Sequence, residues 1–271
     1  MENFIIKSPA KINLALDLLY KRQDSFHEID TIMAKIDFFD TINMKKNDSL
    51  VVLCDNVKES DNLIYKAIKN LEELTFKKFN YLIKVQKNIP MGAGLAGGSS
   101  NAGVVLRFLG DKYNISDEIL YQAGEKTGSD VNFFIYKGNF ARCMGKGEII
   151  IPLNLNLKKE FLIVKPDIHS NTAEVYKNFD IKEKNKNVSI NNILYKINKG
   201  IMVEKTEIFN VLEKPAFKLY NKISECFCFL ENKFEFVRMS GSGACFFIFD
   251  KNINISLNKE LYFLKKVKFL S

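Results

Sequence analysis

Glycines are concentrated in one short segment of the chain, Pro90-Met91-Gly92-Ala93-Gly94-Leu95-Ala96-Gly97-Gly98-Ser99-Ser100-Asn101. Glycine adopts positive φ without a steric penalty and lets the backbone come close to a ligand. Successive N–H groups in such a loop form an anion-binding nest, and a following helix adds the positive end of its dipole. The polar residues after the glycines supply further contacts. The pattern predicts a phosphate-binding loop.

The two commonest phosphate loops do not fit this segment. Residues 92–97 match the spacing Gly-x-Gly-x-x-Gly, but the preceding residues 81–86 alternate polar and apolar like a half-exposed strand. A dinucleotide-binding fold normally places a continuous apolar strand there. The Walker pattern also fails, because no Gly-Lys-Ser/Thr closes the loop. The alternative to a phosphate site is a glycine-rich turn of purely structural use.

Two polar side chains near the N-terminus share one face of a predicted strand. Residues 10–18 alternate, so Lys11, Asn13 and Ala15 are expected to point the same way. The opposite face then carries aliphatic side chains. Lys11 and Asn13 therefore offer a cation and an amide to the same site.

Helices must position the remaining groups. With Asp61 as N-cap, apolar residues at helical spacing predict a helix through residue 74 and place Asn62 in its first turn. Further helices are expected over residues 100–109 and 116–124. The segment Gly128-Ser129-Asp130-Val131 directly follows the last of these.

A second glycine segment occurs late in the chain. Residues Met239-Ser240-Gly241-Ser242-Gly243-Ala244 lead into the apolar residues 245–249, which predicts a tight loop entering a buried strand. Residues 161–166 also read as a strand, and the polar residues 182–187 as a solvated loop.

The composition fits a globular protein with a sizeable core. The 271 residues are 46% hydrophobic, which is enough for two domains, and we place them at 1–155 and 156–271. The net charge is +8, but the 40 lysines and arginines are scattered, so no nucleic-acid partner is expected. Five cysteines without metal-ligand spacing indicate reduced thiols. No stretch has the length of a membrane span, and we expect a cytoplasmic monomer or weak homodimer.

Three separated segments together resemble the motifs of the GHMP kinases. They are Pro9-Ala10-Lys11-Ile12-Asn13-Leu14, the glycine segment 90–101, and the late segment 239–244. The likeness extends over nearly the whole chain. It implies a two-domain α+β fold, with a ribosomal S5 domain 2-like N-terminal domain and a ferredoxin-like C-terminal domain. The substrates would then lie in the cleft between the two domains.

One segment narrows the resemblance within the family. Arg22-Gln23-Asp24-Ser25-Phe26-His27-Glu28 looks like the Arg-x-Asp-Gly-Tyr-His-Glu segment of the members that act on a cytidine diphosphate ester of methylerythritol. Galactokinases and mevalonate kinases lack it. Segments 61–64, 127–131 and 170–176 agree in order and place. The resemblance implies transfer of the γ-phosphoryl group of ATP, with Mg²⁺, to the 2-hydroxyl of 4-diphosphocytidyl-2-C-methyl-D-erythritol, a step toward isoprenoid precursors.

The resemblance also implies roles on the ATP side. Asp130 would deprotonate the acceptor hydroxyl, and Lys11 would stabilise the charge that develops. Pro90 and residues Gly92 to Ser100 would surround the phosphates, while Asn62 and Lys87 match the adenosine pocket of the family. The alternatives are a turn or cap aspartate for Asp130, a solvated strand lysine for Lys11 and a helix-start residue for Asn62.

On the acceptor side, the family holds cytosine between aromatic faces beside a histidine. The matching positions for the acceptor are Asn13, Phe26, His27, Thr172 and Tyr176. Gly241 and Ser242 would shape the phosphate end of the cleft, and no residue is assigned to the metal. A half-buried structural imidazole is the alternative for His27, and His169 is expected to be structural.

Departures from the family pattern change individual contacts rather than the class of protein. Phe26 and Ser25 stand where tyrosine and glycine are usual, and Ala96 stands where a further glycine is common. A methyl group at position 96 fits if φ there is negative. The rival interpretations are a GHMP kinase with a small alcohol acceptor such as homoserine, a protein of this fold that binds without catalysis, and an RNA-binding protein.

Overall fold

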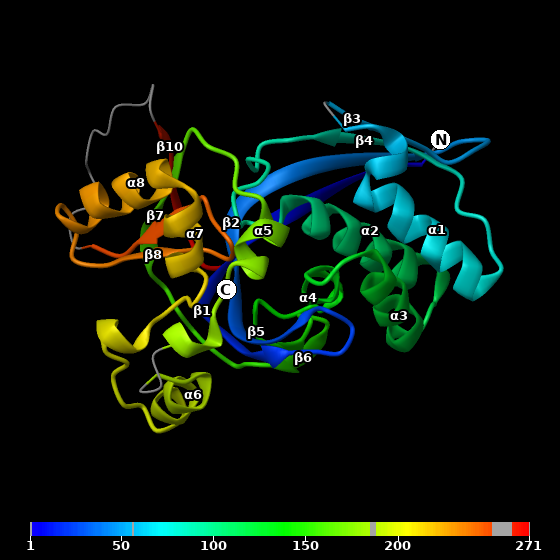
Figure 1. Ribbon diagram of the computed structural model, residues 1–271. Coiled ribbons are helices and arrows are strands. Elements are labelled where there is room, and N and C mark those ends of the chain that lie inside the picture. The colour runs from blue at the N-terminus through cyan, green and yellow to red at the C-terminus, as the bar shows by residue number, and fades with distance from the viewer. Residues whose placement is uncertain (1, 56, 185–187, 251–261, 271) are drawn as a thin grey trace.

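The computed structural model describes residues 2–55, 57–184, 188–250 and 262–270, and it contains two sheets (Figure 1). In the described residues, the first sheet has the order β3-β4-β2-β5-β6, with β1 paired to β2, and the second has the order β10-β7-β9-β8. The strands of the first sheet are β1 (Asn3–Lys21), β2 (His27–Lys46), β3 (Val51–Cys54), β4 (Tyr81–Gln86), β5 (Phe140–Gly145) and β6 (Ile149–Pro152). Those of the second are β7 (Glu160–Pro166), β8 (Val237–Met239), β9 (Phe246–Ile248) and β10 (Tyr262–Lys268).

The mixture of helices and mainly antiparallel sheets confirms the predicted α+β class. The strands of the first sheet end at residue 152 and those of the second begin at residue 160. The two sheets meet where an isolated bridge joins Ile36 to Phe269. The division of the chain at residue 155 stays a prediction.

The long hairpin of β1 and β2 positions the polar residues of the N-terminal motif. Its register shifts between Asn13 and Ala15, so that one extra residue enters β1 there. Beyond this bulge Leu16, and not Ala15, lies on the same face as Lys11 and Asn13. Ala15 packs instead against Ile32 and α6. The prediction for Ala15 was therefore wrong, because strict alternation fails across a bulge.

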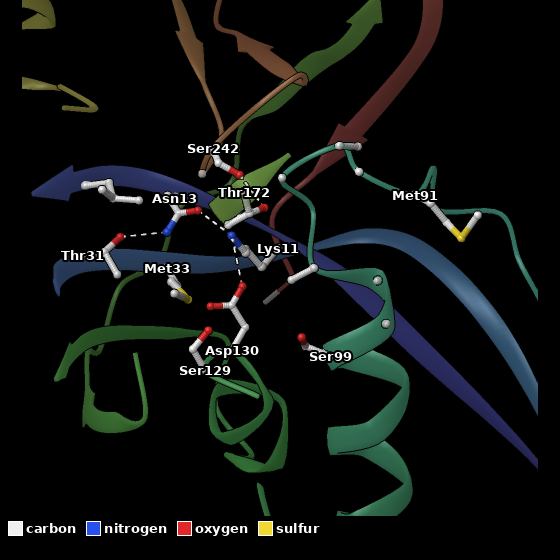
Figure 2. Close-up of a pocket in the computed structure, with 18 of the residues that line it drawn as sticks. Lys11, Asn13, Thr31, Met33, Met91, Ser99, Ser129, Asp130, Thr172 and Ser242 are labelled. Carbon is white, nitrogen blue, oxygen red and sulfur yellow. Dashed lines mark hydrogen bonds and ion pairs between the residues drawn. The ribbon is translucent and has the colours of Figure 1, made fainter. Parts of the chain in front are cut away.

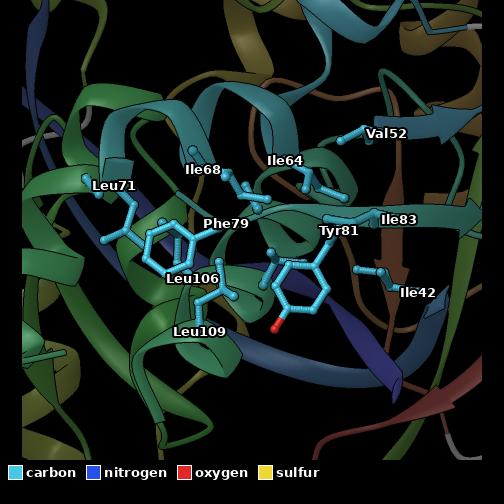
Figure 3. Packing of buried hydrophobic residues seen from close by; sticks show 14 of the residues in the cluster. Ile42, Val52, Ile64, Ile68, Leu71, Phe79, Tyr81, Ile83, Leu106 and Leu109 are labelled. Carbon is cyan, nitrogen blue, oxygen red and sulfur yellow. The ribbon is translucent and has the colours of Figure 1, made fainter. Parts of the chain in front are cut away.

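Helices of the first half cover one face of the first sheet (Figure 1). They are α1 (Leu63–Thr75), α2 (Gly97–Tyr113), α3 (Asp117–Thr127) and α4 (Val131–Ile135), preceded by the short 3₁₀ helix η1 (Glu59–Asp61). Figure 3 shows how Ile64, Ile68 and Leu71 of α1 pack against Leu106 of α2 and Ile83 of β4. Burying each such side chain contributes about 1.5–3 kcal/mol.

Two helix starts differ from the prediction. Asn62, and not Asp61, is the N-cap of α1, because its backbone is extended and its side chain accepts a hydrogen bond of 2.9 Å from the N–H of Ile64. Asp61 belongs to η1. Helix α2 begins at Gly97, within the glycine segment, and ends at Tyr113. The first two residues of α2 are thus both glycines, Gly97 and Gly98.

The helices of the second half are α5 (Thr172–Lys177), η2 (Ile181–Glu183), α6 (Ile190–Asn198), η3 (Lys205–Glu207), α7 (Glu213–Leu219) and α8 (Asn221–Glu231). Among them, α5, α7 and α8 share a hydrophobic core with the second sheet, whereas α6 packs against β1 and β2 of the first. Helices α7 and α8 share a core with Leu16 and Leu18 of β1, so the two halves have buried contacts in common. The predicted solvated loop 182–187 lies partly in η2, and residues 185–187 of it are outside the described residues.

No disulfide bond joins any of the five cysteines, all of which lie in the described residues. Cys54, Cys143, Cys226, Cys228 and Cys245 are all free thiols. No helix in the described ranges combines the length and apolar character that crossing a membrane requires.

We expect that Phe76→Gly stabilises the protein. Phe76 ends α1 in the left-handed conformation (φ 53°), and its ring is 96% exposed, so it contributes no packing. A side chain in this conformation costs about 1–2 kcal/mol, which glycine would remove. Glycine also makes the unfolded chain more flexible, so the net gain in the free energy of unfolding is about 0.5–1 kcal/mol. Urea unfolding measures it. Phe76→Ala is the control and should give no gain; an equal gain from alanine would contradict the argument.

Candidate active site

A cavity of about 350 Å³ opens where the two glycine segments, β1 and the start of α4 meet (Figure 2). Both halves of the chain line it. The predicted site residues that it brings together are Lys11, Asn13, Lys87, Pro90, Gly92, Ala93, Gly94, Ala96, Gly97, Gly98, Ser99, Asp130, Thr172, Tyr176, Gly241 and Ser242. The two glycine segments and the N-terminal strand therefore line one cavity, as the family resemblance implied.

The backbone carbonyls of the first glycine segment accept hydrogen bonds from the second glycine segment and the residue after it. The N–H of Cys245 donates to the carbonyl of Ala93 at 3.2 Å, and the hydroxyl of Ser240 donates to the carbonyl of Gly94 at 3.0 Å. Gly94 has φ +72°, and a Cβ there would overlap the carbonyl oxygen of Ser240. Only glycine fits between the two loops at this position. His169 packs against Gly92 in a similar way, which agrees with a structural role.

The first turn of α2 directs backbone donors into the cavity. Its N-cap is Ala96, and no side chain among the described residues caps the helix. The amides of Gly97, Gly98 and Ser99 lie in the first turn, where an α-helix has no internal acceptors. Such a turn favours an anion, and phosphate binding by this loop stays a prediction.

Ala96 itself has φ +54°, so the condition of a negative φ, under which a methyl group would fit without strain, is not met. The left-handed conformation at Ala96 turns the loop into the helix, and the alanine side chain bears a strain of about 1–2 kcal/mol.

Lys11 and Asp130 face each other across the cavity (Figure 2). Lys11 is only 3% exposed, and its Nζ lies 3.4 Å from Oδ2 of Asp130 and donates to Oδ1 of Asn13 at 2.5 Å. The interpretation of Lys11 as a solvated strand lysine was therefore wrong. Asp130 precedes α4 at the N-cap position, but its carboxylate makes no capping hydrogen bond to the described backbone of α4. That carboxylate is available to a bound hydroxyl group.

The second glycine segment presents its polar groups from a fixed backbone. The side-chain amide of Asn210 donates to the carbonyls of Met239 and Gly241, at 2.8 Å each. Glu213 accepts from the N–H of Met239, and burial raises the pKa of this carboxyl group to about 7. At the tip, the hydroxyls of Ser242 and Thr172 lie 2.9 Å apart.

A second cavity, of about 540 Å³, adjoins the first and contains the aromatic positions. The two cavities share Ile29, Ser129, Thr172 and Tyr176 as lining residues. His27 lies between the rings of Tyr176 and Phe179, each with its centroid 5.9 Å away. Burial, with a smaller contribution from Lys21, lowers the pKa of His27, so its imidazole is neutral at pH 7.

Phe26 stands at the rim of this second cavity. It is 57% exposed, and the ammonium of Lys146 lies 5.6 Å from its ring centroid. Phe26 and His27 thus line the same cavity as Tyr176. This cavity shares a wall with the one that contains the Lys11–Asp130 pair.

Three of the predicted ATP-side residues do not line the cavity. Leu95 is buried in the core between the sheets. Ser100 is fully buried, and its hydroxyl donates to the carbonyl of Pro9 at 2.5 Å. Asn62 uses its side-chain oxygen to cap α1. Lys87 does line the cavity, where its ammonium forms an ion pair with the buried carboxylate of Asp40.

Several lining residues were missed by the sequence analysis. They are Leu16, Ile29, Thr31, Met33, Leu63, Met91 and Ser129. Ile29, Thr31 and Met33 alternate along β2, and a strand assignment for residues 27–46 would have placed them on one face. Ser129 stands beside Asp130 in a segment that the sequence analysis did single out.

Comparison with known proteins agrees with this geometry. The family model described as GHMP kinases N terminal domain matches residues 62–138. The structure of an archaeal mevalonate kinase, from Methanococcus jannaschii, superposes over 100% of this chain and 99% of its own with a TM-score of 0.61 at 16% identity, which concerns the fold alone. The fold and the three converging motifs are those of a GHMP kinase.

Matches over nearly the whole chain identify the family within the GHMP kinases. A 4-diphosphocytidyl-2-C-methyl-D-erythritol kinase of Sulfurihydrogenibium sp. is 38% identical over 90% of both chains, and that of Caldicellulosiruptor bescii is 36% identical over 92% of this chain and 90% of its own. A crystal structure of 4-(cytidine 5'-diphospho)-2C-methyl-D-erythritol kinase superposes with a TM-score of 0.80 at 27% identity, covering 98% of this chain and 99% of that one. The chain belongs to the 4-diphosphocytidyl-2-C-methyl-D-erythritol kinase family.

We expect that Gly94→Ala lowers the free energy of unfolding of the unliganded protein by about 2–5 kcal/mol, because the methyl group overlaps Ser240 and adopts a left-handed conformation. Gly98→Ala is the matched control. A Cβ at Gly98 meets only Leu63, at 3.4 Å, and lies in a helix, where alanine is favoured. Chemical denaturation measures both. Equal stabilities of the two variants would show that the contact between the loops does not depend on Gly94.

Proposed function

We propose that the protein transfers the γ-phosphoryl group of ATP to the 2-hydroxyl of 4-diphosphocytidyl-2-C-methyl-D-erythritol. The observation that carries the proposal is the position of the Lys11–Asp130 pair, which lies beside the phosphate loop and adjoins a cavity lined by aromatic residues. The names of the relatives support the same acceptor. Phosphoryl transfer needs positioning and charge stabilisation, which these groups supply.

On the ATP side, the triphosphate occupies the loop from Gly92 to Ser99. The amides at the start of α2 and the positive end of its dipole favour the anionic oxygens. Mg²⁺ bound to the nucleotide would neutralise part of the phosphate charge, and the hydroxyl of Ser99, which lines the cavity, would help to hold it. The described ranges hold no cluster of three or more acidic, histidine or cysteine side chains that would bind a metal without the nucleotide.

On the acceptor side, cytosine lies in the second cavity among Phe26, His27 and Tyr176. Flat aromatic rings favour stacking with a base, and a neutral imidazole both donates and accepts hydrogen bonds. Thr172 lies in the shared wall of the two cavities, where the diphosphate would pass. The methylerythritol hydroxyl then reaches Asp130.

At the reacting centre, the carboxylate of Asp130 accepts the proton of the acceptor hydroxyl. The ammonium of Lys11 stabilises the carboxylate beforehand and the phosphoryl oxygens during transfer. Its burial excludes water and strengthens both effects.

The wider setting of the reaction completes the proposal. The segments 1–155 and 156–271 act as two domains that both contribute to the cleft. Because the substrates are small molecules, the reaction needs neither a membrane nor a nucleic acid, and we place it in the cytoplasm. A monomer suffices for the site, and any homodimer is expected to be weak.

We expect that Asp130→Asn lowers kcat by about 10³-fold or more, because general base catalysis by a positioned carboxylate contributes on this scale. The affinity for ATP should stay within about twofold, since the backbone of the loop is unchanged. Steady-state kinetics and nucleotide titration measure the two quantities. Asp111→Asn, at a 52% exposed aspartate on α2, is the control and should keep wild-type turnover. An active Asp130→Asn enzyme would overturn the catalytic assignment.

The acceptor is tested by ATP consumption in the presence of Mg²⁺. We expect turnover with 4-diphosphocytidyl-2-C-methyl-D-erythritol and none with homoserine, mevalonate or galactose, because only the first fills the aromatic cavity. Turnover with one of the others would keep the kinase chemistry and reject the cytosine site. Silence with all four would favour a protein that binds without catalysis.

A further inference from the structure

A chain of buried hydrogen bonds lies behind the Lys11–Asp130 pair (Figure 2). The hydroxyl of Thr31 donates to the carbonyl of Ala15 at 2.7 Å, and Nδ2 of Asn13 donates to that hydroxyl at 2.9 Å. Lys11 in turn donates to Oδ1 of Asn13 at 2.5 Å. Thr31 is fully buried, and Asn13 is only 2% exposed. The chain connects the backbone of β1 to the ammonium group.

The direction of this chain is determined by chemistry. A carbonyl oxygen only accepts, so the single hydroxyl proton of Thr31 is used on Ala15. The hydroxyl oxygen can then only accept from Asn13, and of the two ends of an amide only the NH₂ group donates. The amide oxygen of Asn13 must therefore face Lys11. Thr31 thus favours the same orientation of the Asn13 amide as the ammonium of Lys11 does, and holds the NH₂ end in place.

The register shift in β1 lies beside this chain of hydrogen bonds. Asn13 pairs with Met33, and Thr31 lies two residues from Met33 along β2, so Asn13 and Thr31 point to the same cavity. One extra residue then stands between Asn13 and Ala15, and a bulge of this kind disrupts the ladder and leaves a backbone group without its regular partner. The carbonyl of Ala15 accepts the Thr31 hydroxyl at this point.

We propose that Thr31 is a positioning residue for phosphoryl transfer, acting through Asn13 on Lys11. When the hydroxyl is absent, the NH₂ group of Asn13 is left buried without its acceptor, while the amide oxygen still contacts Lys11. A buried donor without a partner is costly, so the side chain shifts toward another acceptor and moves the oxygen that holds Lys11. Lys11 then leaves its position 3.4 Å from Asp130. This role rests on the proposed function, because it assigns Lys11 and Asp130 to the reaction.

The test compares Thr31→Val, which has the same shape without the hydroxyl, with Thr31→Ser, which keeps it. We expect the valine variant to lose about 10²-fold in kcat, the scale of a displaced catalytic group, with the KM for ATP within about twofold. Serine should restore most of the loss. Thr41→Val is the matched control, since Thr41 lies on the same strand but bonds only to the exposed Lys7 in the described chain.

A second measurement follows the Asn13 side-chain amide by NMR. Its protons should be protected from solvent exchange in the wild type and in Thr31→Ser, and should exchange faster in Thr31→Val. A wild-type kcat in folded Thr31→Val, or equal losses in the valine and serine variants, would overturn the proposal. A wild-type protein without turnover would reject the proposed function instead, and the exchange measurement would then decide the role of Thr31 alone: unchanged protection in Thr31→Val contradicts it.

Discussion

A buried ammonium group must be surrounded by oxygen atoms, and the site depends on this requirement at Lys11. Removing a charge from water costs several kcal/mol unless it is paired and hydrogen-bonded. Lys11 obtains its partners from its own strand, at Asn13, and from the start of α4, at Asp130. The same requirement therefore holds the hairpin and the helix together and directs a carboxylate at the place where a hydroxyl would react.

The two cavities differ in the groups that they offer to a ligand: the first offers mainly backbone groups and the second mainly side chains. The phosphate loop offers amides whose positions are fixed by glycines, and such donors suit an anion that every nucleotide carries. The adjoining cavity offers rings and an imidazole, which suit one base. The two meet at Thr172 and Tyr176, both from α5 in the second half of the chain. Discrimination of the acceptor thus depends on the packing of both halves.

Local patterns in the sequence predicted the glycine loop and the shared face of Lys11 and Asn13, and the family resemblance supplied most of the other lining residues. Neighbouring residues are enough to recognise the glycine segment, the strand 81–86 and the segment around Asp130. The structure has these elements at the predicted places. The misses involve partners distant in sequence. The bulge that moves Ala15 out of the cavity is set by pairing with β2, and the positive φ of Ala96 by the loop around it. Thr31 was missed because its partners lie on another strand.

The contact between the two glycine segments also concerns how the protein is made. Ser240 and Gly94 are 146 residues apart, so this hydrogen bond forms only after the chain has been synthesised past residue 240. Contacts of such separation form late, after the entropy of closing a long loop has been overcome. A growing chain that has folded its first half would hold the glycine segment without its partner. A nucleotide bound in the proposed site would in turn favour the assembled state by mass action.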